Sequence, residues 1–200
     1  MMKKKKIFER ATEKGIEQLQ IISRKKEMIN LKMFNDFIEK YKTSNITTYL
    51  LKGIVDEKIG ICKTETLSNN LIDDILDSII ESATFKDDEL EDIYNDEEKI
   101  RYKEKFPDIN IEDQIDRFKK VYTDLKEYDN HIIGIESYFT VNKTSVRIEN
   151  NNGLDKLDDQ LKYSYYISVA ATDGEKNVDE DFVSLTKQDI DIYDKSFEVG

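Results

Sequence analysis

Few residue types in this 200-residue chain could carry out covalent chemistry. It contains one cysteine, Cys62, and one histidine, His131, so a thiol or hydroxyl nucleophile would depend on that single imidazole as its base. Cys62 stands in an apolar strand pattern that begins at Ile59, which is typical of a buried and unreactive thiol. Ser137, the serine nearest to His131 in the sequence, falls among the buried-face positions of another strand pattern. We therefore expect no catalytic residue in this chain.

The chain also offers few metal ligands. A catalytic zinc site takes typically three protein ligands, and this chain has too few soft ligands to form one, so we expect no metal and no cofactor in it. Two acidic runs could supply carboxylates for acid–base or metal chemistry. The first is much more typical of a solvated helix face, and the second lacks the ordered spacing and central glycine of a calcium loop. The first run comprises Asp73, Asp74, Asp77 and Glu81, and the second comprises Asp87, Asp88, Glu89, Glu91 and Asp92.

The net charge of −12 argues against nucleic acid as a partner, because a phosphate backbone would be repelled. The only basic run, Lys3 to Lys6, is expected to be an exposed helix start. No apolar segment follows it as in a signal peptide, and no stretch approaches the roughly 20 apolar residues of a membrane span. A lone cysteine agrees with a reducing compartment. We therefore expect a cytoplasmic protein with no nucleic-acid or membrane partner.

Hydrophobic periodicity predicts a first set of elements in the N-terminal part of the chain. Helical spacing covers residues 3–14, and alternation over 19–33 indicates one long bent strand or two short strands. Residues 46–64 read as two strands joined by a turn. Ser68 is a candidate N-cap for a helix whose wide apolar stripe runs over residues 71–83.

A second helix-then-sheet set follows in the C-terminal part. Apolar residues at helical spacing predict a helix over 111–125. After it, strands alternate with turns that contain Asn, Asp or Gly, residues that accept turn conformations. The predicted strands cover residues 133–141, 146–148, 161–171 and 183–185, and the predicted turns lie at 142–143, 150–153 and 173–174.

These elements predict an α+β fold of two small units, each mainly antiparallel sheet with flanking helices. The predicted domains are an N-terminal α+β domain over 1–85 and a central α+β domain over 111–200, which we expect to be truncated at its C-terminal end. Between them, residues 86–110 form a predicted acidic linker with a short helix near 96–105.

Two groups of residues resemble motifs of the PmbA/TldD family, the "modulator of DNA gyrase" proteins. The first motif is a strand followed by a Leu-Ser pair and a helix. The second is an Asn-x-x-Gly turn followed by a Ser/Tyr-rich strand that ends in Asp-Gly. Asn45 to Thr48 and Asn69 depart from the family's usual glycines and proline, which suggests a divergent member. The matching residues are Gly60, Cys62, Leu67, Ser68 and the 71–83 helix, and then Asn150, Gly153, Tyr163, Ser164, Ser168, Ala171, Asp173 and Gly174.

This resemblance implies a zinc metallopeptidase system that processes peptides, often as a dimer of related subunits. It also implies that the zinc lies in a missing C-terminal domain with a His-Glu-x-x-x-His motif, because no family ligand matches a residue of this chain. The hypothesis is therefore a non-catalytic N-terminal portion that helps to form the substrate cavity and subunit contacts and is inactive alone. Its expected partners are a peptide substrate and either a second copy or a related paralogous subunit. The alternative is a stand-alone protein- or peptide-interaction module without peptidase activity.

Overall fold

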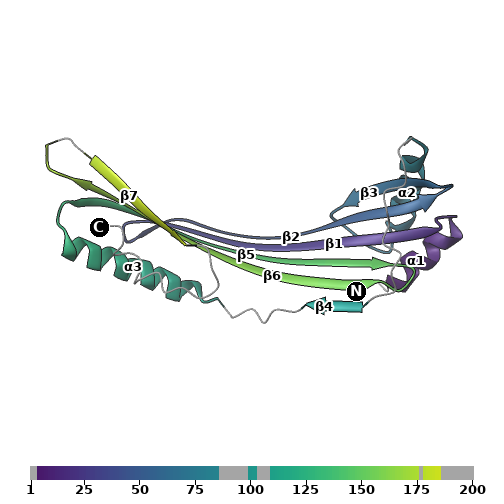
Figure 1. Ribbon diagram of the computed structural model, residues 1–200, viewed down its shortest axis with the longest axis horizontal. Coiled ribbons are helices and arrows are strands. Elements are labelled where there is room, and N and C mark those ends of the chain that lie inside the picture. The colour runs from purple at the N-terminus through teal and green to yellow at the C-terminus, as the bar shows by residue number, and fades with distance from the viewer. Residues whose placement is uncertain (1–3, 86–98, 103–108, 176–177, 186–200) are drawn as a thin grey trace. The chain divides into compact units, whose positions relative to one another are not determined.

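The computed structural model of the chain describes residues 4–85, 99–102, 109–175 and 178–185. Its strands form one sheet in the order β3-β2-β1-β5-β6-β4, and β7 also pairs with β6. The sheet is mostly antiparallel, although β4 joins β6 in parallel, and with three helices it confirms the predicted α+β class. The elements are α1 (Lys4–Glu13), β1 (Gln18–Phe34), β2 (Phe37–Val55), β3 (Lys58–Thr64), α2 (Ile72–Thr84), β4 (Lys99–Tyr102), α3 (Ile111–Tyr128), β5 (Ile132–Asn150), β6 (Asp155–Thr172) and β7 (Val178–Leu185), labelled in Figure 1.

The chain divides into two compact units that are discontinuous in sequence, because β1, β2, β5 and β6 each contribute residues to both. The sequence-based domain ranges 1–85 and 111–200 remain predictions. Residues 86–98 and 103–108, which make up most of the predicted linker and include the calcium-like acidic run, lie outside the described residues, as does the chain after 185. Residues 99–102 form β4 and not part of the predicted short helix. Unit 1 comprises 1–26, 46–104 and 144–159, and unit 2 comprises 27–45, 105–143 and 160–200.

The core of unit 1 forms where α1 and α2 bury their apolar stripes against strand residues. Helix α2 lies against β3, as Figure 1 shows. The two elements approach so closely that Ser82 of α2 accepts a hydrogen bond at 2.6 Å from the backbone N–H of Ile61 in β3. Gly60, next to Ile61, leaves room for the α2 backbone at this contact. The buried core residues are Ile7, Ala11, Ile16, Leu19, Ile21, Leu51, Ile72, Ile75, Leu76 and Ile79.

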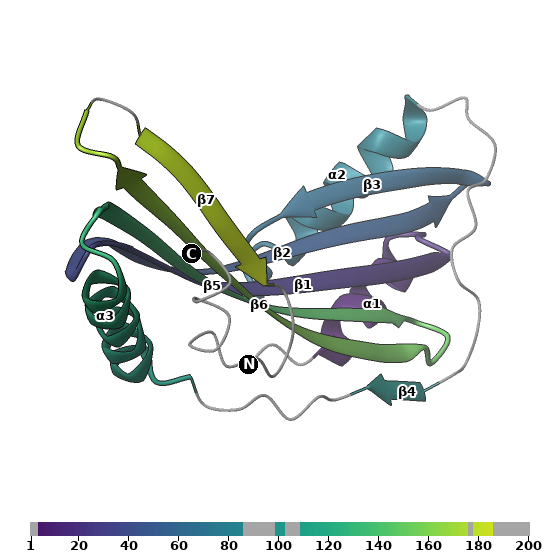
Figure 2. The same cartoon turned by 60° about the vertical axis from the view of Figure 1, so that its left-hand side comes forward.

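The core of unit 2 forms between α3 and the unit's strands. Figure 2 shows α3 beside this part of the sheet. The predicted helix begins at Asn110, whose side chain accepts a hydrogen bond from the N–H of Glu112, as an N-cap does. Its buried face presents Phe118, Val121 and Leu125. The strand residues of this core are Leu31, Met33, Ile132, Ile135, Phe139, Val141, Leu161, Tyr163, Ile167 and Val169.

Three of the predicted turns are confirmed by backbone conformation. The β2–β3 turn has positive φ at Asp56 and Glu57, of 47° and 62°. Gly153 and Gly174 have φ of 106° and 84°, a region that glycine enters without a side-chain clash. The long alternating stretch 161–171 lies within β6, and its predicted partner is the antiparallel strand β7.

The predicted turn at Asn142-Lys143 is wrong, and a different hairpin was missed. β5 continues through both residues to Asn150, because its neighbours β1 and β6 pair with it on either side. The chain instead reverses after β1 at Asn35, which adopts a φ of 54°. Asn35 donates its N–H to the carbonyl of Ile135 at 2.7 Å, and its side-chain oxygen accepts the Ile135 N–H at 3.0 Å. These two bonds fix the hairpin tip to β5.

The predicted N-cap at Ser68 is also wrong. Helix α2 starts at Ile72, and its N-cap is Leu71, which makes no side-chain capping bond. Ser68 instead bonds the side chain of Asn70 at 2.6 Å, and its carbonyl accepts the N–H of Leu71 at 3.1 Å. Ser68 therefore forms a turn just before the helix, since serine bonds locally in turns as readily as at caps.

Gly60→Ala should strongly destabilise the fold. A Cβ at this position would lie 1.9 Å from the carbonyl oxygen of Ile79, so the α2 backbone would have to move. We expect a loss of roughly 2–3 kcal/mol in the free energy of unfolding, measured by urea denaturation. Gly134→Ala is the matched control, because its Cβ would meet only the ring of Phe34 at 3.4 Å, an ordinary contact. Equal losses for the two variants would contradict the close approach at Gly60.

Candidate functional site

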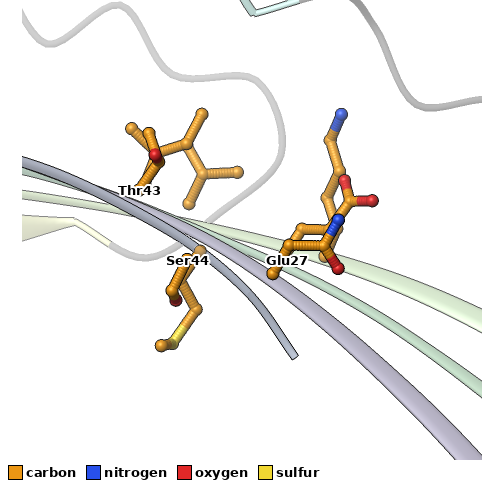
Figure 3. Close-up of a pocket in the computed structure, with 8 residues that line it drawn as sticks. Glu27, Thr43 and Ser44 are labelled. Atoms are coloured by element: carbon orange, nitrogen blue, oxygen red, sulfur yellow. The ribbon is translucent and has the colours of Figure 1, made fainter. Parts of the chain in front are cut away.

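A pocket of about 380 Å³ lies in unit 2. Met28, Ile29 and Val141 give it apolar walls, and Glu27 and Lys143 bring one negative and one positive group. Figure 3 shows Glu27, Thr43 and Ser44 at this pocket. No local motif signals it in the sequence, because its residues come from three separate strands. The lining residues are Glu27, Met28, Ile29, Thr43, Ser44, Asn45, Val141 and Lys143.

The pocket is suited to binding. The hydroxyl oxygen of Ser44 is buried and has no hydrogen-bond partner among the described residues. Buried polar groups are normally satisfied, so this hydroxyl is available to a bound polar group. None of the eight lining residues is a cysteine or histidine, so the pocket itself brings no strong nucleophile or imidazole base. Its residues can hold a ligand of mixed apolar and charged character.

His131 lies on the surface just before β5, and its side chain is 63% exposed. Its Nδ1 is 2.8 Å from Oδ1 of Asp129, and its backbone N–H donates to the same oxygen at 2.8 Å. Both hydrogen bonds lower the pKa of Asp129, and the bond from the backbone N–H has the larger effect. The imidazole thus closes a local turn. Among the described contacts it does not meet a serine or cysteine nucleophile.

Cys62 and Ser137 are both held in strands. Cys62 of β3 packs beside the core of unit 1, and burial raises the pKa of its thiol, which disfavours the reactive thiolate. Ser137 of β5 is 1% exposed. The structure does not bring either residue to His131 within the described contacts. The expectation of no catalytic residue remains a prediction.

The first acidic run on α2 forms ion pairs with α1. Arg10 donates to Asp73 at 2.7 Å, and Lys14 bonds Asp77. The hydrogen bond from Arg10 lowers the pKa of Asp73. Such carboxylates connect the two helices at an exposed face. This arrangement gives no support to acid–base chemistry by these residues.

Asp155 of β6 is the centre of a charged cluster in unit 1 that sequence reasoning missed. Arg147 of β5 donates to both of its carboxylate oxygens, at 2.7 and 2.9 Å, and Arg101 of β4 donates at 3.0 Å. The hydrogen bond from Arg147 is the main cause that lowers the pKa of Asp155 to about 2. The cluster ties the short parallel strand β4 to β6, which is a structural role.

Lys32 of β1 forms a second cluster, in unit 2. Its ammonium lies 2.7 Å from Glu39 of β2 and 3.1 Å from Glu136 of β5, and 5.2 Å from the ring centre of Tyr138. The hydrogen bond to Glu39 is the main cause that raises the pKa of Lys32. Glu39 therefore has its charge compensated within the chain.

The described residues do not fit the zinc that the family resemblance implies. In the described ranges, no group of three or more His, Cys, Asp or Glu is placed to hold a metal ion. His131 is bonded to Asp129, Asp73 is bonded to Arg10, and Asp77 is bonded to Lys14. The expectation of no metal in this chain stays a prediction.

The described residues form an α+β fold, and unit 2 of this fold contains a pocket. Residues 104–196 match the family model of the PmbA/TldA metallopeptidase central domain. This segment is therefore similar to a domain of the PmbA/TldD family, and the match confirms the resemblance seen in the sequence. No curated protein matches the chain significantly. Within the described ranges, no helix is long and apolar enough to cross a membrane.

Several solved structures share the fold. A Thermotoga maritima protein described as a modulator of a DNA gyrase has a TM-score of 0.79 at 16% identity, covering 98% of this chain and 46% of its own. A Bacteroides thetaiotaomicron protein of the same description has a TM-score of 0.69 at 15% identity, covering 91% and 43%. TldE from Thermococcus kodakarensis has a TM-score of 0.71 at 14% identity, covering 98% and 46%. The chain thus spans less than half the length of these proteins.

Asp155→Asn should remove stability that depends on pH. The folded-state pKa of about 2 lies below the ordinary 3.8, so the carboxylate stabilises the fold above about pH 4 and loses this contribution as pH falls toward 2. Between pH 7 and pH 2 the difference in unfolding free energy between the two proteins should shrink by roughly 2 kcal/mol. Urea denaturation across this range measures it. Asp36→Asn, which removes one exposed carboxylate, is measured in parallel as the control for the loss of formal charge. A difference that stays constant with pH for Asp155→Asn would refute the assignment.

Proposed function

We propose that this chain is the non-catalytic N-terminal portion of a PmbA/TldD-like zinc metallopeptidase involved in peptide processing. In that role it helps to form the substrate cavity and the subunit contacts. The observation that supports the proposal is the fold match: 98% of this chain corresponds to 46% of a Thermotoga maritima protein and of TldE. The zinc would then lie in the part of such a protein that this chain does not represent.

The chemistry of the described residues supports binding and positioning. Peptide-bond cleavage needs an activated water or nucleophile, a proton shuttle and stabilisation of the oxyanion. Here the one imidazole is bonded to Asp129, and the one thiol has a raised pKa. The pocket of unit 2 and the exposed strand edges offer apolar walls and main-chain groups, which are the features that hold an extended peptide.

The proposed partners are a peptide substrate and either a second copy of the chain or a related paralogous subunit. The proposed compartment is the cytoplasm, supported by the single cysteine, which agrees with a reducing compartment.

A stand-alone protein- or peptide-interaction module is the second candidate. The large exposed side chains on β2, including Phe37 and Tyr41, favour it, because they would serve a partner without any peptidase attached. Reading the coding sequence past residue 200 distinguishes the two candidates. A His-Glu-x-x-x-His motif in frame supports the peptidase, and a stop codon at that point supports the module.

The purified chain should bind an unstructured peptide and leave it intact. We expect saturable fluorescence anisotropy with a labelled peptide of mixed composition, and mass spectrometry should find only full-length peptide, with or without added zinc. Absence of binding would contradict the cavity role. His131→Ala is the control for cleavage: hydrolysis that survives extensive purification and disappears in this variant would show that the chain is itself catalytic.

The chain should not bind duplex DNA, although two of its structural relatives are described as modulators of DNA gyrase. Its net charge of −12 opposes a phosphate backbone at physiological salt. A gel-shift assay should show free DNA at all protein concentrations tested. A complex that weakens steeply as salt rises would contradict this expectation, since such salt dependence indicates direct phosphate contacts.

A further inference from the structure

Strand β2 has an unprotected edge in unit 2. β3 pairs with β2 only from Tyr49 to Val55. Over Phe37 to Asn45, β2 therefore has a strand partner only on its β1 side among the described residues. Such an edge presents unpaired backbone N–H and C=O groups to any extended chain that approaches it.

Three of the exposed side chains along this edge are large and hydrophobic. Phe37 is 71% exposed, Tyr41 is 53% exposed and Ile38 is 50% exposed. Natural proteins normally protect edge strands with charges, prolines or bulges, and long apolar edges are sites of strand addition. The edge from Phe37 to Asn45, here called the β2 edge, thus has the features of an interaction surface.

The two faces of the β2 edge differ in charge. Alternation along a strand places Ile38, Lys40 and Lys42 on one face and Glu39 on the other. Glu39 is compensated by Lys32 at 2.7 Å. Lys40 and Lys42 are exposed and form no ion pair with another described residue. On a chain of net charge −12, this face of the β2 edge is therefore locally basic.

We propose that the β2 edge binds an extended segment of another polypeptide that carries acidic side chains two residues apart. The segment adds to the sheet by main-chain hydrogen bonds along Phe37 to Asn45. Its two carboxylates lie opposite Lys40 and Lys42, since directly opposed residues of neighbouring strands have their Cβ atoms about 5 Å apart. An apolar residue beside them covers Ile38.

A second copy of this chain fits the edge poorly. Two copies of β2 related by a two-fold axis would pair antiparallel with the same face on the same side. If the two-fold axis passes through residue 39, 40 or 42, that residue lies opposite the same residue of the other copy. Glu39 then faces Glu39, Lys40 faces Lys40, or Lys42 faces Lys42. A register centred on Tyr41 opposes Lys40 to Lys42. Directly opposed like charges destabilise a strand pair, so an acidic segment of a different chain is the better complement.

This inference deepens the binding role proposed above and rests on it. Because the test measures binding and not cleavage, its failure would leave the relationship to peptidases untouched. Binding of the mixed-composition peptide without preference for acidic side chains would support the general role and overturn this specific one.

The test uses three labelled heptapeptides with the purified full chain. One is Val-Thr-Asp-Thr-Asp-Thr-Val, and the others carry Asn or Lys in place of both Asp residues. By fluorescence anisotropy the Asp peptide should bind roughly 3- to 30-fold tighter than the Asn peptide, as expected for two exposed ion pairs, and the Lys peptide weakest. The Asp peptide with N-methylated backbone nitrogens should lose binding, because it cannot complete the ladder. If the methylated and unmethylated Asp peptides bind with equal affinity, strand addition is overturned, and this result requires no protein variant.

A second experiment measures binding of the same peptides to a protein variant with reversed charges on the β2 edge. Lys40→Glu with Lys42→Glu should reverse the preference, so that the Lys peptide binds tighter than the Asp peptide. The matched control, Lys119→Glu with Lys162→Glu, changes the net charge equally at exposed positions and should leave the preference intact. An equal change in both proteins would overturn the site in favour of general charge attraction. Sedimentation velocity of the chain without peptide measures self-association. If the chain self-associates and the double variant Lys40→Glu with Lys42→Glu does not, a second copy occupies the edge and the proposal is overturned.

Discussion

The structure depends on the need of four long strands to pair their backbone groups. β1, β2, β5 and β6 contain 17, 19, 19 and 18 residues, and each N–H and C=O away from water needs a partner. β1 and β5 meet this need because they have neighbours on both sides. Among the described residues, β2 has an outer strand neighbour only where β3 accompanies it, so the rest of its outer edge is open to solvent or to another chain.

Periodicity in the sequence predicted the α+β class, all three long helices and most strands, because apolar alternation and helical spacing are local signals. Pairing across the sheet is not local, and the errors follow from it. Asn142-Lys143 has turn-forming residue types, yet strand pairing on both sides keeps β5 extended. Asn35 reverses the chain because its side chain can bond Ile135, a residue remote in sequence. The pocket could not be predicted from local sequence patterns either, because β1, β2 and β5 each supply part of its lining.

Most of the reactive groups that the sequence offered are already engaged in structural bonds. His131 is bonded to Asp129. Of the α2 carboxylates, Asp73 is bonded to Arg10 of α1, and Asp77 is bonded to Lys14, just after α1. These bonds lower the pKa of Asp73 and of Asp129, whereas a general acid or base at neutral pH needs a pKa near the working pH. Within the described ranges, the Ser44 hydroxyl has no hydrogen-bond partner and β2 has no outer strand partner from Phe37 to Asn45, and both features suit recognition.

The two hydrogen bonds between Asn35 and Ile135 have an entropic consequence for recognition. A hairpin tip without such bonds would fluctuate, and a partner would have to order it on docking at a cost of roughly 1 kcal/mol for each residue fixed. Here the tip is already held against β5 in its extended form. A partner then loses only its own chain freedom, so even a short segment can bind with useful affinity, and preorganisation of this kind mainly slows its release.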